Sequence, residues 1–199
     1  MSAVIFDGKE FAKQIEIEIR DRVKRPLKLV TIYNPKDEGS RVYTNVKAKK
    51  AQELGIEFEK VPYFAKASKG GQFSIKDLII RLNRDKTVDG VMIQMPLGSD
   101  NDQFLIDLID LKKDVDGLRP ELGVMPATVK AVLKILKQAD VRGAICVVGN
   151  KGLVGSRLQK ELKCEGMDKE DFRPEALKNY DVIISCTGEA ALIHGYMVK

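Results

Sequence analysis

The fold class of this chain is decided by residues 145–155, which read Ile145-Cys146-Val147-Val148-Gly149-Asn150-Lys151-Gly152-Leu153-Val154-Gly155. The first four residues are apolar and partly β-branched, which is typical of a short buried strand. A glycine-containing loop follows, and the apolar spacing up to Leu162 predicts a helix. In such a strand–loop–helix unit, backbone N–H groups and the helix N-terminus bind phosphate. The spacing departs from G-x-G-x-x-G, so this prediction depends on the position of the loop.

Strands and helices alternate along the rest of the chain. Five strands are expected, at residues 27–33, 56–64, 88–94, 144–148 and 182–186. Helices are expected to begin at Asp7, Ser40, Ser74, Asp100, Pro126, Leu153 and Pro174, the fourth of them running to Leu111. Residues 163–171 are polar and make a poor strand. This alternation predicts an α/β fold built from parallel βαβ units.

The bulk composition is that of a soluble globular protein. The 199 residues are 44% hydrophobic and 32% charged, with a net charge of +5 and no tryptophan. We find no apolar run of the roughly 20 residues that span a bilayer, and no secretory signal, so a cytoplasmic protein without membrane contact is expected. Without a basic tail or interleaved aromatic and basic residues, nucleic-acid binding is poorly supported.

Cysteine and histidine offer little material for a metal site. The three cysteines are too scattered for a zinc motif, and their odd number favours reduced thiols. We expect Cys146 and Cys186 in the core and the single histidine, His194, in a structural or surface position. No metal is predicted.

Tyr43 and Lys47 lie one helical turn apart, so both side chains project from one helix face. A partly desolvated lysine beside a phenol is suited to proton transfer. The same spacing also fits a solvated lysine at the edge of an amphipathic helix. Arg41, Lys47, Lys49 and Lys50 form a basic group that either is solvated or attracts an anionic substrate.

Three further segments place polar residues at the ends of expected strands or between the two expected units. Gln94, followed by Pro96, ends the strand at residues 88–94, where ligands of parallel sheets bind. Asp116 lies in Lys113-Asp114-Val115-Asp116-Gly117, either a ligand site or a hinge. Thr187 and Gly188 end the last strand, facing a nucleotide or forming an ordinary turn.

Taken in this order, these segments resemble the bifunctional methylenetetrahydrofolate dehydrogenase/methenyltetrahydrofolate cyclohydrolase family. The resemblance rests on Ser40-x-x-Tyr43-x-x-x-Lys47, Asp89-Gly90 leading to Gln94-Met95-Pro96-Leu97, residues 113–117, residues 149–155, and residues 181–188 followed by Leu192-Ile193. It covers almost the whole chain.

The resemblance implies a folate-binding αβα catalytic domain at residues 1–120 and an incomplete Rossmann-like NAD(P)-binding domain at residues 121–199. It implies oxidation of 5,10-methylenetetrahydrofolate with NADP, or alternatively NAD, as the cofactor. It also implies hydrolysis of the methenyl product to 10-formyltetrahydrofolate. The catalytic set would be Lys47, Tyr43, Gln94 and Asp116, with Tyr43, Gln94, Pro96 and Asp116 contacting the folate. The cofactor would contact Gly149, Asn150, Lys151, Val154, Gly155, Thr187 and Gly188. A homodimer is also implied.

Several positions depart from the family pattern. Asn150-Lys151 replaces Arg-Ser in the nucleotide loop, the strand expected within residues 163–171 looks eroded, and the family continues beyond Lys199. We therefore expect a fragment or a reduced member, in which the cyclohydrolase step is the better preserved. One alternative is a non-catalytic folate- or nucleotide-binding relative. The other is a shikimate-type NADP dehydrogenase, which the Gln94 and Asp116 motifs disfavour.

Overall fold

A three-stranded parallel sheet forms the centre of the first half of the chain. The computed structural model describes residues 5–64, 74–119 and 124–199. Strands β1 (Lys28–Tyr33), β2 (Glu57–Pro62) and β3 (Gly90–Ile93) pair in the order β2-β1-β3. The middle of β1 and all of β3 are buried, because these apolar runs are covered on both faces. The parallel pairing confirms the βαβ interpretation for this half.

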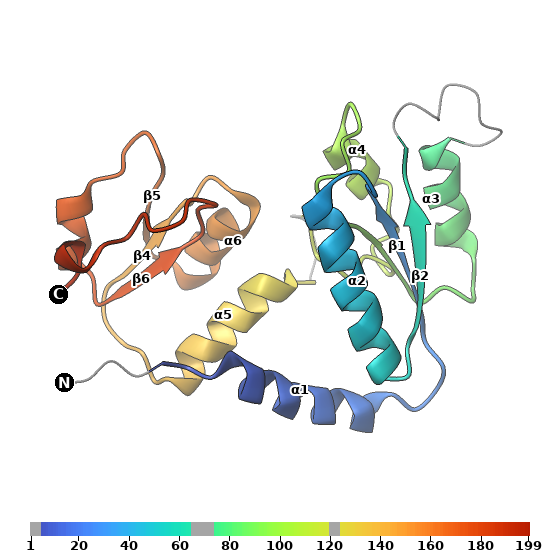
Figure 1. Cartoon of the computed structure of the whole chain (residues 1–199), viewed down its shortest axis with the longest axis horizontal. Coiled ribbons are helices and arrows are strands. Elements are labelled where there is room, and N and C mark those ends of the chain that lie inside the picture. The colour runs from blue at the N-terminus through green and yellow to red at the C-terminus, as the bar shows by residue number, and fades with distance from the viewer. Residues whose placement is uncertain (1–4, 65–73, 120–123) are drawn as a thin grey trace. The chain divides into compact units, whose positions relative to one another are not determined.

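Four helices accompany this sheet, and their first residues follow from side-chain caps. Helix α1 covers Gly8–Arg22, α2 Glu38–Glu53, α3 Ile75–Arg84 and α4 Asp102–Asp107. Asp7 and Ser74 cap α1 and α3 where these helices were expected to begin, and at Ser74 the Asp77 side chain completes a capping box that the sequence did not predict. Helix α2 packs against β1 and β2 (Figure 1).

Two of the expected helix boundaries are wrong. Helix α2 begins before Ser40, because the Asp37 carboxylate accepts a hydrogen bond from the Ser40 N–H (2.6 Å) and caps the helix three residues earlier. Helix α4 is shorter than the expected 100–111, because Asn101 caps its first turn and Leu108 caps its last.

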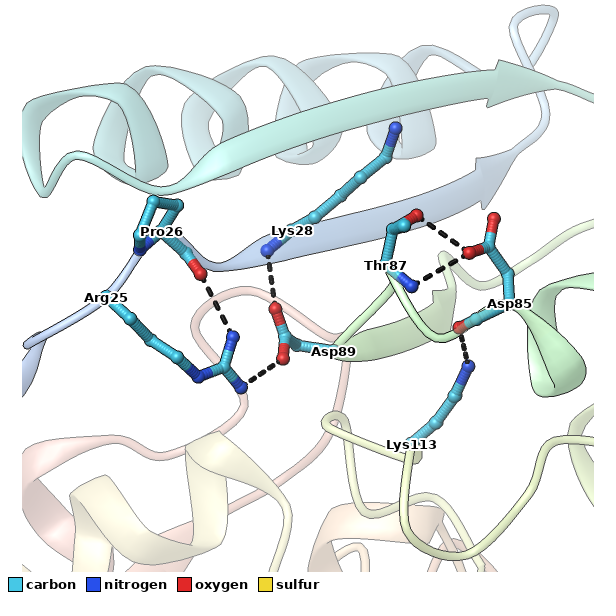
Figure 2. Close-up of polar contacts among 7 residues, drawn as sticks. All are labelled: Arg25, Pro26, Lys28, Asp85, Thr87, Asp89 and Lys113. Atoms are coloured by element: carbon cyan, nitrogen blue, oxygen red, sulfur yellow. Dashed lines mark hydrogen bonds and ion pairs between the residues drawn. The ribbon is translucent and has the colours of Figure 1, made fainter.

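Asp89 and Lys113, which belong to two of the family motifs, stabilise the end of the sheet opposite Gln94. Figure 2 shows Asp89 between the Arg25 guanidinium and the Lys28 N–H, both of which donate hydrogen bonds to its carboxylate. These two donors hold the pKa of the Asp89 carboxyl below its ordinary value. Lys113 donates to the carbonyls of Leu82 and Asp85, and so satisfies the last turn of α3. Both residues are therefore structural.

A second three-stranded parallel sheet forms the other half of the chain. Strands β4 (Ile145–Val148), β5 (Glu165–Met167) and β6 (Val182–Ser185) pair in the order β5-β4-β6. Helices α5 (Ala127–Gln138) and α6 (Leu153–Leu162) pack together, and α6 also packs against β4. Two 3-10 turns, η2 (Pro174–Asn179) and η3 (Gly195–Met197), complete this half.

Two expectations for this half are wrong. The eroded strand is present as β5, because pairing with β4 supplies the backbone hydrogen bonds that its polar sequence does not favour by itself. Strand β6 is half-buried instead of buried, because it is the outer strand of the described sheet.

The chain divides into two compact units, residues 1–122 and residues 123–199. Each unit contains one parallel sheet, so the α/β fold class is confirmed at that level. Among the described residues, none of the helices combines the length and apolar character that crossing a membrane requires.

Candidate functional site

Lys47 is the centre of a partly buried polar site in the first unit. It extends from α2 one turn after Tyr43, and its side chain is one-third exposed, whereas Tyr43 is 63% exposed. The Lys47 Nζ lies 3.6 Å from the Asp116 carboxylate and 3.7 Å from the Met92 sulfur on β3. The structure therefore brings Lys47 and Asp116 together as an ion pair beside the sheet.

Asp116 is held at this place by Asp114. The buried Asp114 carboxylate accepts hydrogen bonds from the N–H groups of Asp116 (3.1 Å) and Gly117 (2.9 Å). Asp114 also forms a backbone bridge to Val91, so this turn lies alongside β3. Burial raises the pKa of the Asp116 carboxyl, an effect that Lys47 opposes and the charge of Asp114 reinforces. The carboxyl group is thus poorly solvated and suited to recognising a polar group of a substrate.

Gln94 follows β3, but its side chain is not bonded to Lys47. Its amide donates to the Met95 carbonyl (3.2 Å), and within the described part of the chain its buried Oε1 has no hydrogen-bond partner. A buried acceptor without a partner costs free energy unless something fills the place. The predicted contact that would tune Lys47 is therefore not formed, and the Gln94 amide bonds to the neighbouring backbone instead.

The loop after Gln94 is fixed by Asp102, a residue that the motifs did not single out. Pro96 is exposed and follows a cis peptide bond. The Asp102 carboxylate accepts hydrogen bonds from the N–H groups of Leu97 (3.0 Å), Gly98 (3.1 Å) and Ser99 (2.8 Å). Asp102 thereby orders the loop that presents Pro96 to solvent.

The glycine loop of the second unit connects β4 to α6 in a conformation that only glycine suits. Gly149 has a φ of +88°, and a Cβ added there would lie 3.0 Å from the Cys186 backbone carbon. A Cβ at Gly155 would lie 2.1 Å from the Gly149 carbonyl oxygen. The loop therefore lies against both the start of α6 and the end of β6.

A cavity of about 580 Å³ opens at the carboxyl ends of the three strands of this unit. Its size falls within the range of small-molecule sites, and its place is where open parallel sheets bind ligands. The cavity is lined by Val148, Gly149, Gly152, Asp168, Lys169, Phe172, Cys186, Thr187, Gly188, Glu189 and Leu192.

The predicted cofactor residues divide into two groups. Gly149, Thr187 and Gly188 line the cavity. The remaining four lie beside it: Asn150 donates to Gln159, Lys151 pairs with Glu170, Val154 packs in the core, and Gly155 supports the loop. These four residues shape the loop and do not line the cavity.

The prediction that Cys186 is a core residue holds in part, because this half-buried side chain packs against the core cluster around Val147 and also lines the cavity. Cys146 is fully buried, and burial raises the pKa of its thiol to about 11. His194 is exposed and stacks on Tyr196, as expected of a surface residue.

The glycine loop fits a nicotinamide dinucleotide. The positive φ of Gly149 and the lack of a Cβ at Gly152 leave backbone close to the cavity, as a pyrophosphate requires. Asp168, which the motifs also missed, follows β5 and lines the same cavity. Its position about 20 residues after the first glycine was a usable signal in the sequence.

The first unit has a parallel sheet and a lysine–carboxylate pair. The second unit has a parallel sheet and a cavity beside a glycine loop of the kind that binds dinucleotides. Together they define a class of α/β proteins with two such units. The sequence model for "Tetrahydrofolate dehydrogenase/cyclohydrolase, catalytic domain" matches residues 6–116. This chain therefore belongs to the tetrahydrofolate dehydrogenase/cyclohydrolase family.

Individual relatives agree with this assignment. The bifunctional protein FolD of Caldanaerobacter subterraneus subsp. tengcongensis is 32% identical over the whole chain, and that of Fusobacterium nucleatum subsp. nucleatum 31% over 98% of it; each match covers 78% of the relative. A 5,10-methylenetetrahydrofolate dehydrogenase of the silkworm Bombyx mori superposes with a TM-score of 0.82 at 25% identity, over 100% of this chain and 80% of that one. The NAD-dependent enzyme of Saccharomyces cerevisiae superposes at 0.75 over 94% and 80%, and at 18% identity this shows the fold alone.

Proposed function

We propose that this protein interconverts one-carbon folates, hydrolysing 5,10-methenyltetrahydrofolate to 10-formyltetrahydrofolate and oxidising 5,10-methylenetetrahydrofolate with a nicotinamide dinucleotide. The observation that carries this proposal is the Lys47 ammonium 3.6 Å from a partly buried Asp116 carboxylate, on a helix that also presents Tyr43. Membership of the family and identities near 30% support it.

In the hydrolytic step, a water molecule adds to the methenyl carbon, and the bond from that carbon to the ring nitrogen breaks. The attacking water gives up a proton and the leaving nitrogen takes one, so a single amine between them serves both transfers. Lys47 is proposed for this role because its Nζ lies between the Met92 sulfur (3.7 Å) and the Asp116 carboxylate (3.6 Å), while its side chain remains one-third exposed. Asp116 anchors the pterin through its carboxyl group, and the exposed Tyr43 ring offers a face for stacking.

The oxidative step needs a hydride acceptor, which the nicotinamide ring supplies when the dinucleotide is bound. Gly149 and Gly152 are proposed to receive the pyrophosphate, and Thr187 and Gly188 to border the cavity beside it. The homodimer implied by the family resemblance stays a prediction, which sedimentation analysis of the purified chain would test.

The decisive experiment is the rate of methenyltetrahydrofolate hydrolysis by wild type and Lys47→Met. Loss of the proton-transferring amine is expected to lower kcat at least roughly 100-fold. Lys49→Met is the matched control, since Lys49 is an exposed lysine of the same helix, and it is expected to keep near-normal turnover.

Near-wild-type turnover by Lys47→Met would remove Lys47 from the mechanism. If wild type binds 5-formyltetrahydrofolate, used as a stable folate probe, yet turns over neither folate substrate with either dinucleotide, the alternative of a non-catalytic binding protein holds instead.

A further inference from the structure

Asp168 lies where a dinucleotide-binding unit distinguishes its cofactor. It follows β5 directly, lines the cavity of the second unit, and comes about 20 residues after Gly149. A carboxylate at this position of the fold accepts a hydrogen bond from a ribose 2′-hydroxyl, whereas a nearby basic group accommodates a 2′-phosphate. The chemistry of this one position therefore bears on which dinucleotide binds.

We propose that Asp168 makes this protein selective for NAD over NADP. This inference rests on the proposed function, whose dinucleotide site it specifies, and it replaces the preference for NADP that the family resemblance implied.

The Asp168 carboxylate is fixed in place and charged. One oxygen accepts a hydrogen bond from the Lys151 N–H in the glycine loop (2.8 Å), and the other from the Lys169 N–H (2.7 Å). These donors hold the pKa of the Asp168 carboxyl below its ordinary value. Each carboxylate oxygen accepts more than one hydrogen bond, so both remain able to receive a ribose hydroxyl proton.

Lys151 does not supply the free positive charge that a 2′-phosphate needs. Its ammonium pairs with the Glu170 carboxylate. Both side chains are about two-thirds exposed or more, so the pair contributes little to stability. Its consequence is electrostatic, because Glu170 compensates the charge of Lys151.

Lys169 is the one cation among the described residues that line the cavity. Together, residues 151 and 168–171 carry three carboxylates and two ammonium groups, which leaves a negative balance. A phosphate monoester carries about −1.5 to −2 charges at pH 7, and placing it against the fixed Asp168 carboxylate is unfavourable. A neutral ribose hydroxyl meets no such repulsion and gains a charge-assisted hydrogen bond.

The test is the ratio of dissociation constants for NADH and NADPH, obtained with the full chain from the fluorescence of each reduced dinucleotide. Wild type is expected to bind NADH at least roughly 30-fold more tightly. Asp168→Asn keeps an acceptor for the Lys151 N–H but loses the charge, so the ratio is expected to fall at least roughly fivefold. Glu170→Gln releases Lys151 and should tighten NADPH binding about threefold without altering NADH binding.

Asp140→Asn is the matched control, because it removes an exposed carboxylate of the same unit at the other end of β4 and should leave the ratio unchanged. Circular dichroism and the thermal midpoint verify that each variant is folded. Should Asp168→Asn fail to fold, the wild-type ratio and Glu170→Gln decide the question.

The outcomes separate the two proposals. Equal or tighter binding of NADPH by wild type, or a ratio unaffected in folded Asp168→Asn, overturns the selectivity alone. If wild type binds both dinucleotides equally and Lys169→Met weakens NADPH binding tenfold, residues 168–171 would be assigned to binding a phosphate instead. Binding of neither dinucleotide overturns the selectivity together with the oxidative half of the proposed function.

Discussion

At the scale of single residues, two polar side chains of the first unit are held in an arrangement that costs stability. Asp116 is mostly buried with a raised carboxyl pKa, and Gln94 has a buried oxygen without a partner among the described residues. Binding sites commonly keep such unfavourable groups because a ligand satisfies them. Stability and folate affinity are therefore expected to change in opposite directions on substitution.

Asp116→Asn is expected to increase the free energy of unfolding at pH 7 by roughly 0.5–1 kcal/mol, since it removes a charge that burial disfavours. The pKa of Asp116 is raised in the folded state, so its ionisation opposes folding only above the unfolded pKa of about 3.9. The difference between wild type and variant should thus be near zero at low pH and grow as the pH rises through the folded pKa. Urea denaturation across that pH range measures it.

The same substitution is expected to raise the KM for methenyltetrahydrofolate at least roughly tenfold, because a charged hydrogen bond to the substrate is lost. A variant that is less stable than wild type at pH 7 would mean that the ion pair with Lys47 outweighs the cost of burial.

At the scale of the elements, one side chain and one glycine fix where a helix ends and where a loop turns. Lys113 satisfies the last turn of α3, and Gly155 lets α6 begin against the glycine loop. Neither role involves a substrate, yet both residues belong to the motifs that carry the family resemblance. Each therefore predicts an effect on stability or loop geometry that is separable from the chemistry.

Lys113→Met keeps the aliphatic stem but removes the donor to the carbonyls of Leu82 and Asp85, and is expected to destabilise the protein by about 1–2 kcal/mol. Chemical denaturation measures this change, with the neighbouring exposed Lys112→Met as control. Equal stability of the two variants would show that the cap is not a stabilising contact.

Gly155→Ala places a Cβ 2.1 Å from the Gly149 carbonyl, so the glycine loop must shift. We expect NADH affinity to fall at least roughly tenfold while methenyltetrahydrofolate hydrolysis is retained. Gly195→Ala is the control, because nothing lies within 4 Å of a Cβ added there. Unchanged NADH binding by Gly155→Ala would separate the loop from the dinucleotide site.

At the scale of the whole molecule, the two units carry different chemistry on the same kind of sheet. The first unit contains Lys47 and Asp116, and the second contains the cavity of about 580 Å³. Because each unit has its own core, the proposed ligands should act on different parts of the chain.

Hydrogen exchange of backbone amides is expected to separate these effects. A folate analogue should protect segments around residues 43–47 and 94–98, and NADH should protect those around 148–152 and 186–189, since ligands stabilise the elements they contact. Labelling of the full chain, followed by proteolysis and mass spectrometry of the peptides, measures the protection of both regions in one experiment. NADH protection confined to the first unit would contradict the assignment of the cavity.

The sequence alone determined the α/β class, the caps at Asp7 and Ser74, and the motifs that indicate the family. These features follow from neighbours a few residues apart, through periodicity, capping and breakers. Only the tertiary structure decided that β5 forms, that Asp114 and Asp102 order the turns near the lysine site, that Gln94 does not bond to Lys47, and that Glu170 pairs with Lys151. Each of these depends on where separate segments meet, because a backbone or side-chain group chooses among partners that local sequence does not bring together.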